Sequence, residues 1–177
     1  MRYLILAILS AFAMIVTSAD AADAAVAPAH VGRHTATVED EREIRQVVAE
    51  FQSALKTKNT YQLASLMLHS DIEFASPTPP EVLRKLQESV DPNAVPVRAG
   101  GLRDFARFIR DSKVPVEERF YNLKITQDKH IAWVMFDYEF VEDGKVGNYG
   151  IETWQMTKNI EGKWKIASVW WSTNLMQ

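Results

Sequence analysis

The apolar residues of this chain change their spacing part-way along its length. Between residues 38 and 57 they recur at helical intervals, at Ile44, Val47, Val48, Phe51 and Leu55. The last third is strand-like, with four runs rich in β-branched and aromatic residues: 117–126, 130–142, 148–158 and 163–174. Helices followed by an antiparallel meander predict an α+β fold with the helices on one side of the sheet.

Turn and cap residues separate these elements. Thr37 is a candidate N-cap for the long helix, with Asp40 at its N3 position. Asn59 or Thr60 begins a second short helix, and Ile72 and Phe74 belong to a short strand that the prolines from Pro77 onward end. Further helices are expected at 81–90 and after Gly100-Gly101, where Leu102, Phe105, Phe108 and Ile109 form the buried face. Asp143-Gly144 is the strongest hairpin signal in the chain.

The first 21 residues are typical of a cleaved signal peptide. Arg2 precedes the apolar run Leu4–Val16, and Ala19 and Ala21 are the small residues of a cleavage site. We expect residues 22–36 to form a flexible tail and residues 37–177 to form one domain. The product is then an exported protein, periplasmic or secreted, with no membrane segment after cleavage.

Charge and composition exclude several classes of function. The formal net charge is −3, so the chain offers no electrostatic case for nucleic acid or anionic membranes. It has no cysteine, which excludes disulfides, thiolate metal sites and a cysteine nucleophile. His30 and His34 fall in the tail without a third ligand, so no metal and no cofactor is expected. His69 and His130 are expected at a helix end and in a turn.

Several short motifs resemble the nuclear transport factor 2-like superfamily, in its SnoaL-like branch. They are His130-Ile131-Ala132-Trp133-Val134, Asp143-Gly144-Lys145, Ile151-Glu152-Thr153-Trp154, Gly162-Lys163-Trp164-Lys165-Ile166 and the helix end Lys58-Asn59. The resemblance covers roughly residues 38–75 and 100–174, and the stretch 77–98 does not align. It implies a cystatin-like α+β cone, a curved antiparallel sheet wrapped on the long N-terminal helix.

The resemblance also shows where one known chemistry is missing. Steroid-isomerase-type members use a tyrosine on the first helix and an aspartate after the first strand. The matching positions look like Phe51 and Ser76, which supply neither the hydrogen-bond donor nor the base.

Strand alternation defines two candidate faces of the sheet. One face mixes carboxylates with tryptophans and predicts a ligand pocket lined by Phe51, Met135, Asp137, Glu152, Trp154 and Trp170. The other is mainly apolar and predicts a homodimer face made by Val134, Phe136, Tyr138, Ile151, Val169 and Trp171. The opposite assignment, with the apolar face as core, is the alternative.

Three functions are compatible with these observations. The first is an exported binding module for a small, partly apolar ligand. The second is an isomerase- or hydrolase-like enzyme that uses Asp137 and Glu152 as weak candidates for an acid and base. The third is a protein-assembly domain. The sequence does not identify a ligand or substrate.

Overall fold

The long first helix and the strand-rich last third are both present in the computed structural model, which describes residues 28–176. The helices are α1 (Val38–Lys56), α2 (Thr60–Ser65), α3 (Pro80–Ser89) and α4 (Leu102–Asp111). The strands are β1 (Glu73–Pro77), β2 (Val97–Gly101), β3 (Val116–Asp128), β4 (Ile131–Glu142), β5 (Lys145–Lys158), β6 (Trp164–Trp171) and β7 (Asn174–Leu175). The expected signal peptide lies outside the described residues, and residues 28–36 contain no helix or strand.

The first helix begins where the sequence predicts. The Thr37 side chain accepts a hydrogen bond from the Asp40 backbone N–H at 3.0 Å, as an N-cap should. Three acidic residues, Glu39, Asp40 and Glu41, occupy the first turn, where the helix dipole favours negative charge. Asn59 caps α2 in the same way, by accepting from the Gln62 backbone N–H.

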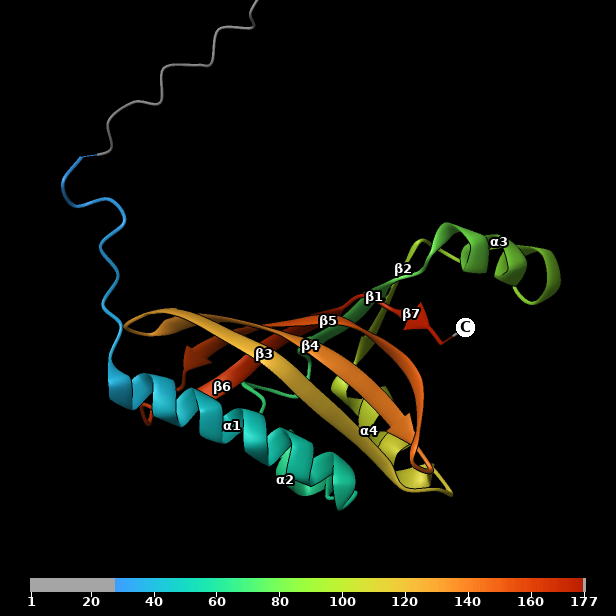
Figure 1. Cartoon of the computed structure of the whole chain (residues 1–177), viewed down its shortest axis with the longest axis horizontal. Coiled ribbons are helices and arrows are strands. Elements are labelled where there is room, and N and C mark those ends of the chain that lie inside the picture. Colours follow the sequence, from blue (N-terminus) through green and yellow to red (C-terminus); the bar gives the residue numbers. More distant parts are fainter. Residues whose placement is uncertain (1–27, 177) are drawn as a thin grey trace, which may run out of the picture. The chain divides into compact units, whose positions relative to one another are not determined.

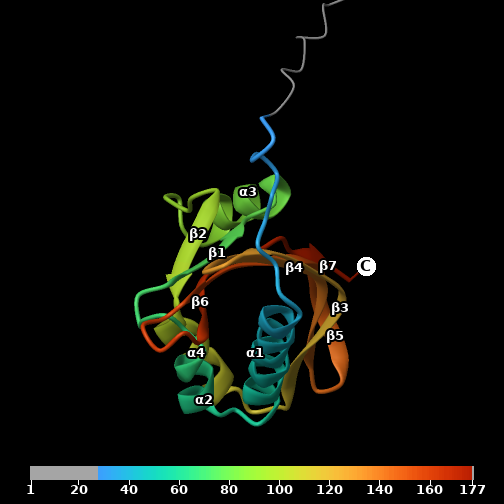
Figure 2. The ribbon, with the colours of Figure 1, turned by 90° about the vertical axis from the view of Figure 1, so that its left-hand side faces the viewer.

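The strands form one curved, unclosed sheet. Its order is β2-β1-β6-β5-β4-β3, with the short β7 paired to β5. The pairs β3–β4, β4–β5 and β5–β6 are antiparallel, whereas β1 runs parallel to β6. The sheet bends around α1, and α2 and α4 lie beside that helix on the same side (Figures 1 and 2). The expected α+β cone is confirmed.

The core fills the space between α1 and the concave face of the sheet. Phe51 of α1 packs on Trp154 of β5 with ring centroids 4.9 Å apart, and Trp154 meets Phe136 of β4 edge-on at 5.1 Å. All three side chains are buried. Burying aromatic groups of this size is a main source of stability in a domain of this length.

Two elements differ from the sequence expectations. β2 forms where no strand is predicted, by adding to the edge of β1, and the strand expected at 163–174 ends at Trp171, so that β7 is a separate short strand paired to β5. Helix α3 confirms the helix expected at 81–90, within the stretch that the resemblance does not cover, and none of its residues is buried. Among the described residues, no helix is both long enough and apolar enough to cross a membrane.

Candidate functional site

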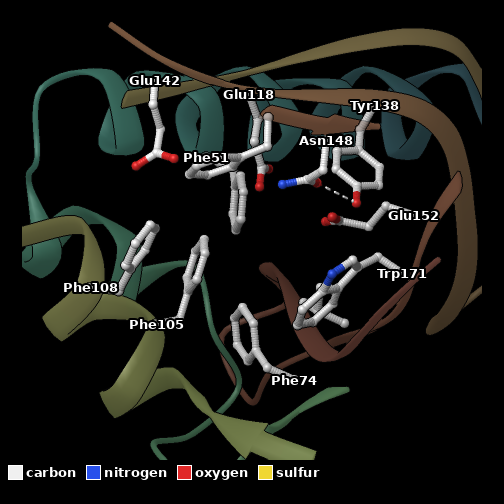
Figure 3. Close-up of a pocket in the computed structure, with 12 residues that line it drawn as sticks. Phe51, Phe74, Phe105, Phe108, Glu118, Tyr138, Glu142, Asn148, Glu152 and Trp171 are labelled. Carbon is white, nitrogen blue, oxygen red and sulfur yellow. Dashed lines mark hydrogen bonds between the residues drawn. The ribbon is translucent and has the colours of Figure 1, made fainter. Parts of the chain in front are cut away.

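A pocket of about 260 Å³ opens between α1, α4 and the concave face of the sheet. Its walls are mainly aromatic (Figure 3), with Phe51, Phe74, Phe105, Phe108, Tyr138, Phe140 and Trp171 presented toward one space. Phe105 of α4 lies between Phe74 and Phe51, at centroid distances of 5.2 Å and 6.3 Å. A concave cavity lined mainly by aromatic side chains is the usual form of a small-molecule site.

The mouth of the pocket lies beside the β4–β5 hairpin and α4. Phe108 is 46% exposed although it also lines the pocket, and its ring packs 5.8 Å from that of Phe140. Glu142 is half-buried, and both Glu142 and Phe108 also border a groove on the outer surface. The pocket therefore meets solvent beside Phe108 and Glu142.

Two glutamates project into the apolar interior of the pocket. Glu152 of β5 is 3% exposed, and its Oε1 accepts a hydrogen bond from Trp154 Nε1 at 2.6 Å. Glu118 of β3 is 7% exposed, and its buried Oε2 has no hydrogen-bond partner among the described residues. Buried carboxyl oxygens are normally satisfied, so an unpartnered one that faces a cavity points to a missing donor.

The surroundings of these two carboxyls favour their protonated forms. Burial raises the pKa of Glu152 to about 8, although the hydrogen bond from Trp154 opposes this rise. Burial also raises the pKa of Glu118 well above its usual value, and the charge of Glu152 adds to the effect. At neutral pH the pocket therefore holds carboxylic acids that can both donate and accept a proton.

Polar groups from β4, β5 and the C-terminal segment complete one wall. The Tyr138 hydroxyl lies 2.9 Å from two acceptors, Asn148 Oδ1 and the backbone oxygen of Ser172. Burial raises the pKa of Tyr138 far above its usual value, so the hydroxyl stays protonated. With its oxygen engaged, Asn148 turns its amide nitrogen toward the pocket (Figure 3).

The structure divides the predicted pocket residues between two faces. Phe51 and Glu152 line the pocket, and Trp154 lies fully buried beside them. Met135, Asp137 and Trp170 alternate with buried residues of β4 and β6 and do not line this pocket. They lie on the outer face instead, so their assignment to the pocket is wrong. Asp137 binds the Asn122 side chain there at 2.6 Å, on the opposite face from Glu152. The predicted acid–base pair is therefore not brought together, and the carboxyl beside Glu152 is Glu118.

The predicted dimer face is also wrong, because most of its residues lie on the inner side of the sheet. Val134, Phe136, Tyr138 and Val169 are buried against the helices, and Trp171 lines the pocket. Only Ile151, 48% exposed, lies on the outer face as expected. The reason is a register shift between Phe140 and Val141 in the β4–β5 pair. Because of this shift, Phe136 lies opposite Glu152, and residues that lie opposite each other share a face of the sheet. The apolar residues of β4 therefore lie on the same face as Glu152 of β5.

The remaining predictions concern histidines and metals. His30, His34, His69 and His130 are all exposed, and His69 Nδ1 accepts from the Asp71 backbone N–H at 3.2 Å. Within residues 28–176, no three histidine or acidic side chains gather as metal ligands would. Ser76 lies outside the pocket, with its hydroxyl 3.2 Å from that of Thr173.

Sequence reasoning missed Glu118 as a site residue. A signal was present, because Glu118 alternates with Val116 and Phe120 and so shares their inward face. The contributions of Phe74, Phe105, Asn148 and Trp171 depend on how distant elements meet, and no local pattern identifies them.

Solved structures with a similar fold are known. The chain is similar to a protein of unknown function with a cystatin-like fold from Nostoc punctiforme, with a TM-score of 0.55 and 14% identity over 78% of this chain and 93% of that one. The chain has the nuclear transport factor 2-like fold. A nuclear transport factor 2-like protein of unknown function from Shewanella baltica matches with a TM-score of 0.56 and 14% identity, over 81% of this chain and 100% of that one.

A third structure with this fold carries a functional name. It is a candidate scytalone dehydratase from Novosphingobium aromaticivorans, with a TM-score of 0.58 and 14% identity, over 77% of this chain and 85% of that one. At such identities the likeness concerns the fold alone. The sequence matches no protein-family model and no curated protein.

Proposed function

We propose that this domain binds a small, largely apolar molecule in the pocket between α1, α4 and the sheet. The observation that carries the proposal is the unpartnered Glu118 Oε2, buried at the end of an aromatic cavity. A ligand would place its apolar part against the phenylalanines and a polar group against Glu118 and Glu152. Such a division between shape and a few fixed polar contacts is typical of ligand sites.

A variant that fills the pocket tests this proposal. Val169 is 2% exposed and lines the cavity, so Val169→Phe would place a ring where the ligand is expected. Ile151→Phe on the outer face is the matched control. Compounds that raise the melting temperature of the unmutated protein in a fragment screen should lose their effect in the first variant and keep it in the second. Equal effects in both variants would place binding elsewhere.

A second candidate function is acid–base catalysis on the bound molecule. Its specific support is the pair of buried carboxyls, Glu118 and Glu152, whose pKa values burial raises. Glu152 would donate or remove a proton, and Glu118 and Tyr138 would hold the reacting group. The candidate dehydratase with the same fold is compatible with this class of reaction.

Deuterium exchange tests catalysis without knowledge of the substrate. A ligand from the fragment screen that has acidic C–H bonds would be incubated in heavy water and followed by NMR. The unmutated protein should accelerate exchange, and Glu152→Gln should bind the ligand without accelerating it. Equal exchange rates for the two proteins would leave binding as the function.

We also propose that the protein is exported and dimeric. Export rests on the signal-peptide pattern of residues 1–21, and the N-terminal sequence of the mature protein should then begin at Ala22.

The proposed dimer would form through the outer face of the sheet and not through the face predicted from the sequence. Met135, Thr153 and Trp170 form one cross-strand row on that outer face. An assembly role would use the same face.

A further inference from the structure

The donors and acceptors in the pocket are unevenly matched. Three carboxyls line it, from Glu118, Glu142 and Glu152, whereas no lysine, arginine or histidine of the described part of the chain does so. Trp154 Nε1 donates to Glu152, and the Asn148 amide nitrogen also faces the pocket (Figure 3). Among the described residues no donor reaches Glu118 Oε2, so a ligand that complements the carboxyls brings a hydrogen-bond donor to this oxygen.

The rest of the lining favours the same kind of ligand. Six aromatic rings and the Tyr138 phenol surround the carboxyls, and the face of an aromatic ring attracts a cation. Figure 3 shows the carboxyl groups of Glu118 and Glu152 reaching the cavity that Phe51, Phe105 and Trp171 also border. Rings and acidic groups around one cavity form the arrangement by which proteins hold organic ammonium ions.

We propose that the pocket takes a small organic amine in its protonated form, with its ammonium group bound by Glu118 and Glu152 and its apolar part held among the phenylalanines. This inference rests on the proposed binding function and names the class of ligand for it. The ammonium N–H groups would supply the donor that Glu118 Oε2 lacks.

Binding of a cation would displace a proton from this pair of carboxyls. Because burial holds Glu152 protonated up to a pKa of about 8, one carboxyl must ionise to pair with the ammonium. This ionisation lowers the affinity for the amine by a factor of about ten for each unit by which the pKa of the carboxyl exceeds the pH. Affinity should therefore rise as the pH approaches 8.

Within the described part of the chain, two further titratable groups line the pocket with this pair, Tyr138 and Glu142. Tyr138 faces it from β4 and stays protonated over this range, and Glu142 lies at the mouth. Glu142 also borders an outer groove that holds Arg107, Lys113, Asp104 and Asp111. α1 and α4 present Phe51, Phe105 and Phe108 to the pocket, none of which titrates.

Three probes of similar shape test the inference by isothermal titration calorimetry on the unmutated protein. They are 2-phenylethylamine, 2-phenylethanol and 3-phenylpropionate, which differ in the charge of the head group. We expect the amine to bind at least about tenfold more tightly than the alcohol, and the anion to bind most weakly. Titrations in buffers of different ionisation enthalpy should show proton release with the amine alone.

Matched variants locate the interaction. Glu118→Gln and Glu152→Gln should each weaken amine binding about tenfold and leave binding of the alcohol unchanged. Glu139→Gln, on the outer face where Glu139 accepts from the Tyr121 hydroxyl at 3.0 Å, is the control. Proton release by the unmutated protein provides a test that does not depend on folding of the variants.

The outcomes separate this inference from the proposed function. An alcohol or anion that binds as tightly as the amine, and is lost in Val169→Phe, would overturn the amine inference and leave a ligand pocket. If none of the probes binds, and no screened compound depends on Val169, both the inference and the binding function are wrong.

Discussion

The indole N–H of Trp164 donates to Asp40 Oδ1 at 3.0 Å, which joins the last long strand to the first turn of α1. Lys158 contributes an ion pair to the same oxygen at 2.5 Å, and the Thr37 hydroxyl donates to Asp40 Oδ2 at 2.8 Å. One carboxylate therefore fixes the start of the helix against β5 and β6. The hydrogen bonds from Lys158 and Thr37 lower the pKa of Asp40 to about 2.

Replacement of Asp40 by alanine should destabilise the domain. The substitution removes a helix-capping partner and leaves the buried Trp164 N–H without an acceptor. Together these two changes should lower the free energy of unfolding by about 2 kcal/mol. Urea unfolding of Asp40→Ala would measure it, with Glu39→Ala, at an exposed position of the same turn, as the control. Because the pKa of Asp40 is lowered from 3.8, its contribution is complete above about pH 4 and should be lost only as the pH falls toward 2. Equal stability of the two variants would contradict this account.

The buried glutamates should impose the opposite pH dependence on stability. The pKa of Glu152 is raised from 4.5 to about 8, so between these values the folded state binds more protons than the unfolded state. The free energy of unfolding should therefore fall by at least about 1 kcal/mol between about pH 5.5 and pH 8. Urea unfolding at both pH values should show a smaller fall for Glu152→Gln and an unchanged fall for Glu139→Gln. The same fall in all three proteins would show that Glu152 ionises normally.

Gly150 should not tolerate a side chain. A Cβ at this position would overlap the backbone oxygen of Ser172, which also accepts from the Tyr138 hydroxyl. Gly150→Ala should therefore cost about 2 kcal/mol of stability and loosen the polar wall of the pocket. Gly101→Ala is the control, because a Cβ there meets no atom within 4 Å. Thermal melts of both variants would measure the difference, and a neutral Gly150→Ala would mean that the Ser172 segment moves easily.

A charge on the outer face should separate the proposed dimer. Trp133 is 49% exposed and lies beside the row formed by Met135, Thr153 and Trp170, so Trp133→Lys would put a charge in the apolar contact. Light scattering should give a dimer mass for the unmutated protein and a monomer mass for this variant. Ile160→Lys replaces a fully exposed residue in the β5–β6 turn and should leave the dimer intact. A monomer mass for the unmutated protein at micromolar concentration would rule the dimer out.

Local chemistry predicted most of the fold. The Thr37 cap, the helical spacing through Leu55 and the Asp143-Gly144 turn each act over a few residues, and each is found where expected. The parallel pairing of β1 with β6 and the added strand β2 depend on contacts between distant segments, which no local pattern specifies.

The site was harder to predict because register shifts reset the alternation between strands. A shift between Gln155 and Met156 lets both Ile166 and Val169 of β6 face inward, although they are three residues apart. Simple alternation along each strand could therefore not assign the faces of the whole sheet. Strand alternation identified Glu152 and Trp154 on the inner side and misplaced Met135, Asp137 and Trp170, whereas Phe51 was found from the helical spacing of α1.

The pairing of β1 with β6 also sets the order in which the pocket can assemble. Phe74 pairs with Val169, and both line the cavity, yet every other long strand lies between them in the sequence. The antiparallel meander from β3 to β5 has near neighbours and can form early, whereas this contact must close the longest loop between any two paired strands. On this order of assembly, the two glutamates would stay hydrated during synthesis until the final strands emerge, and their raised pKa values would appear only when the pocket closes.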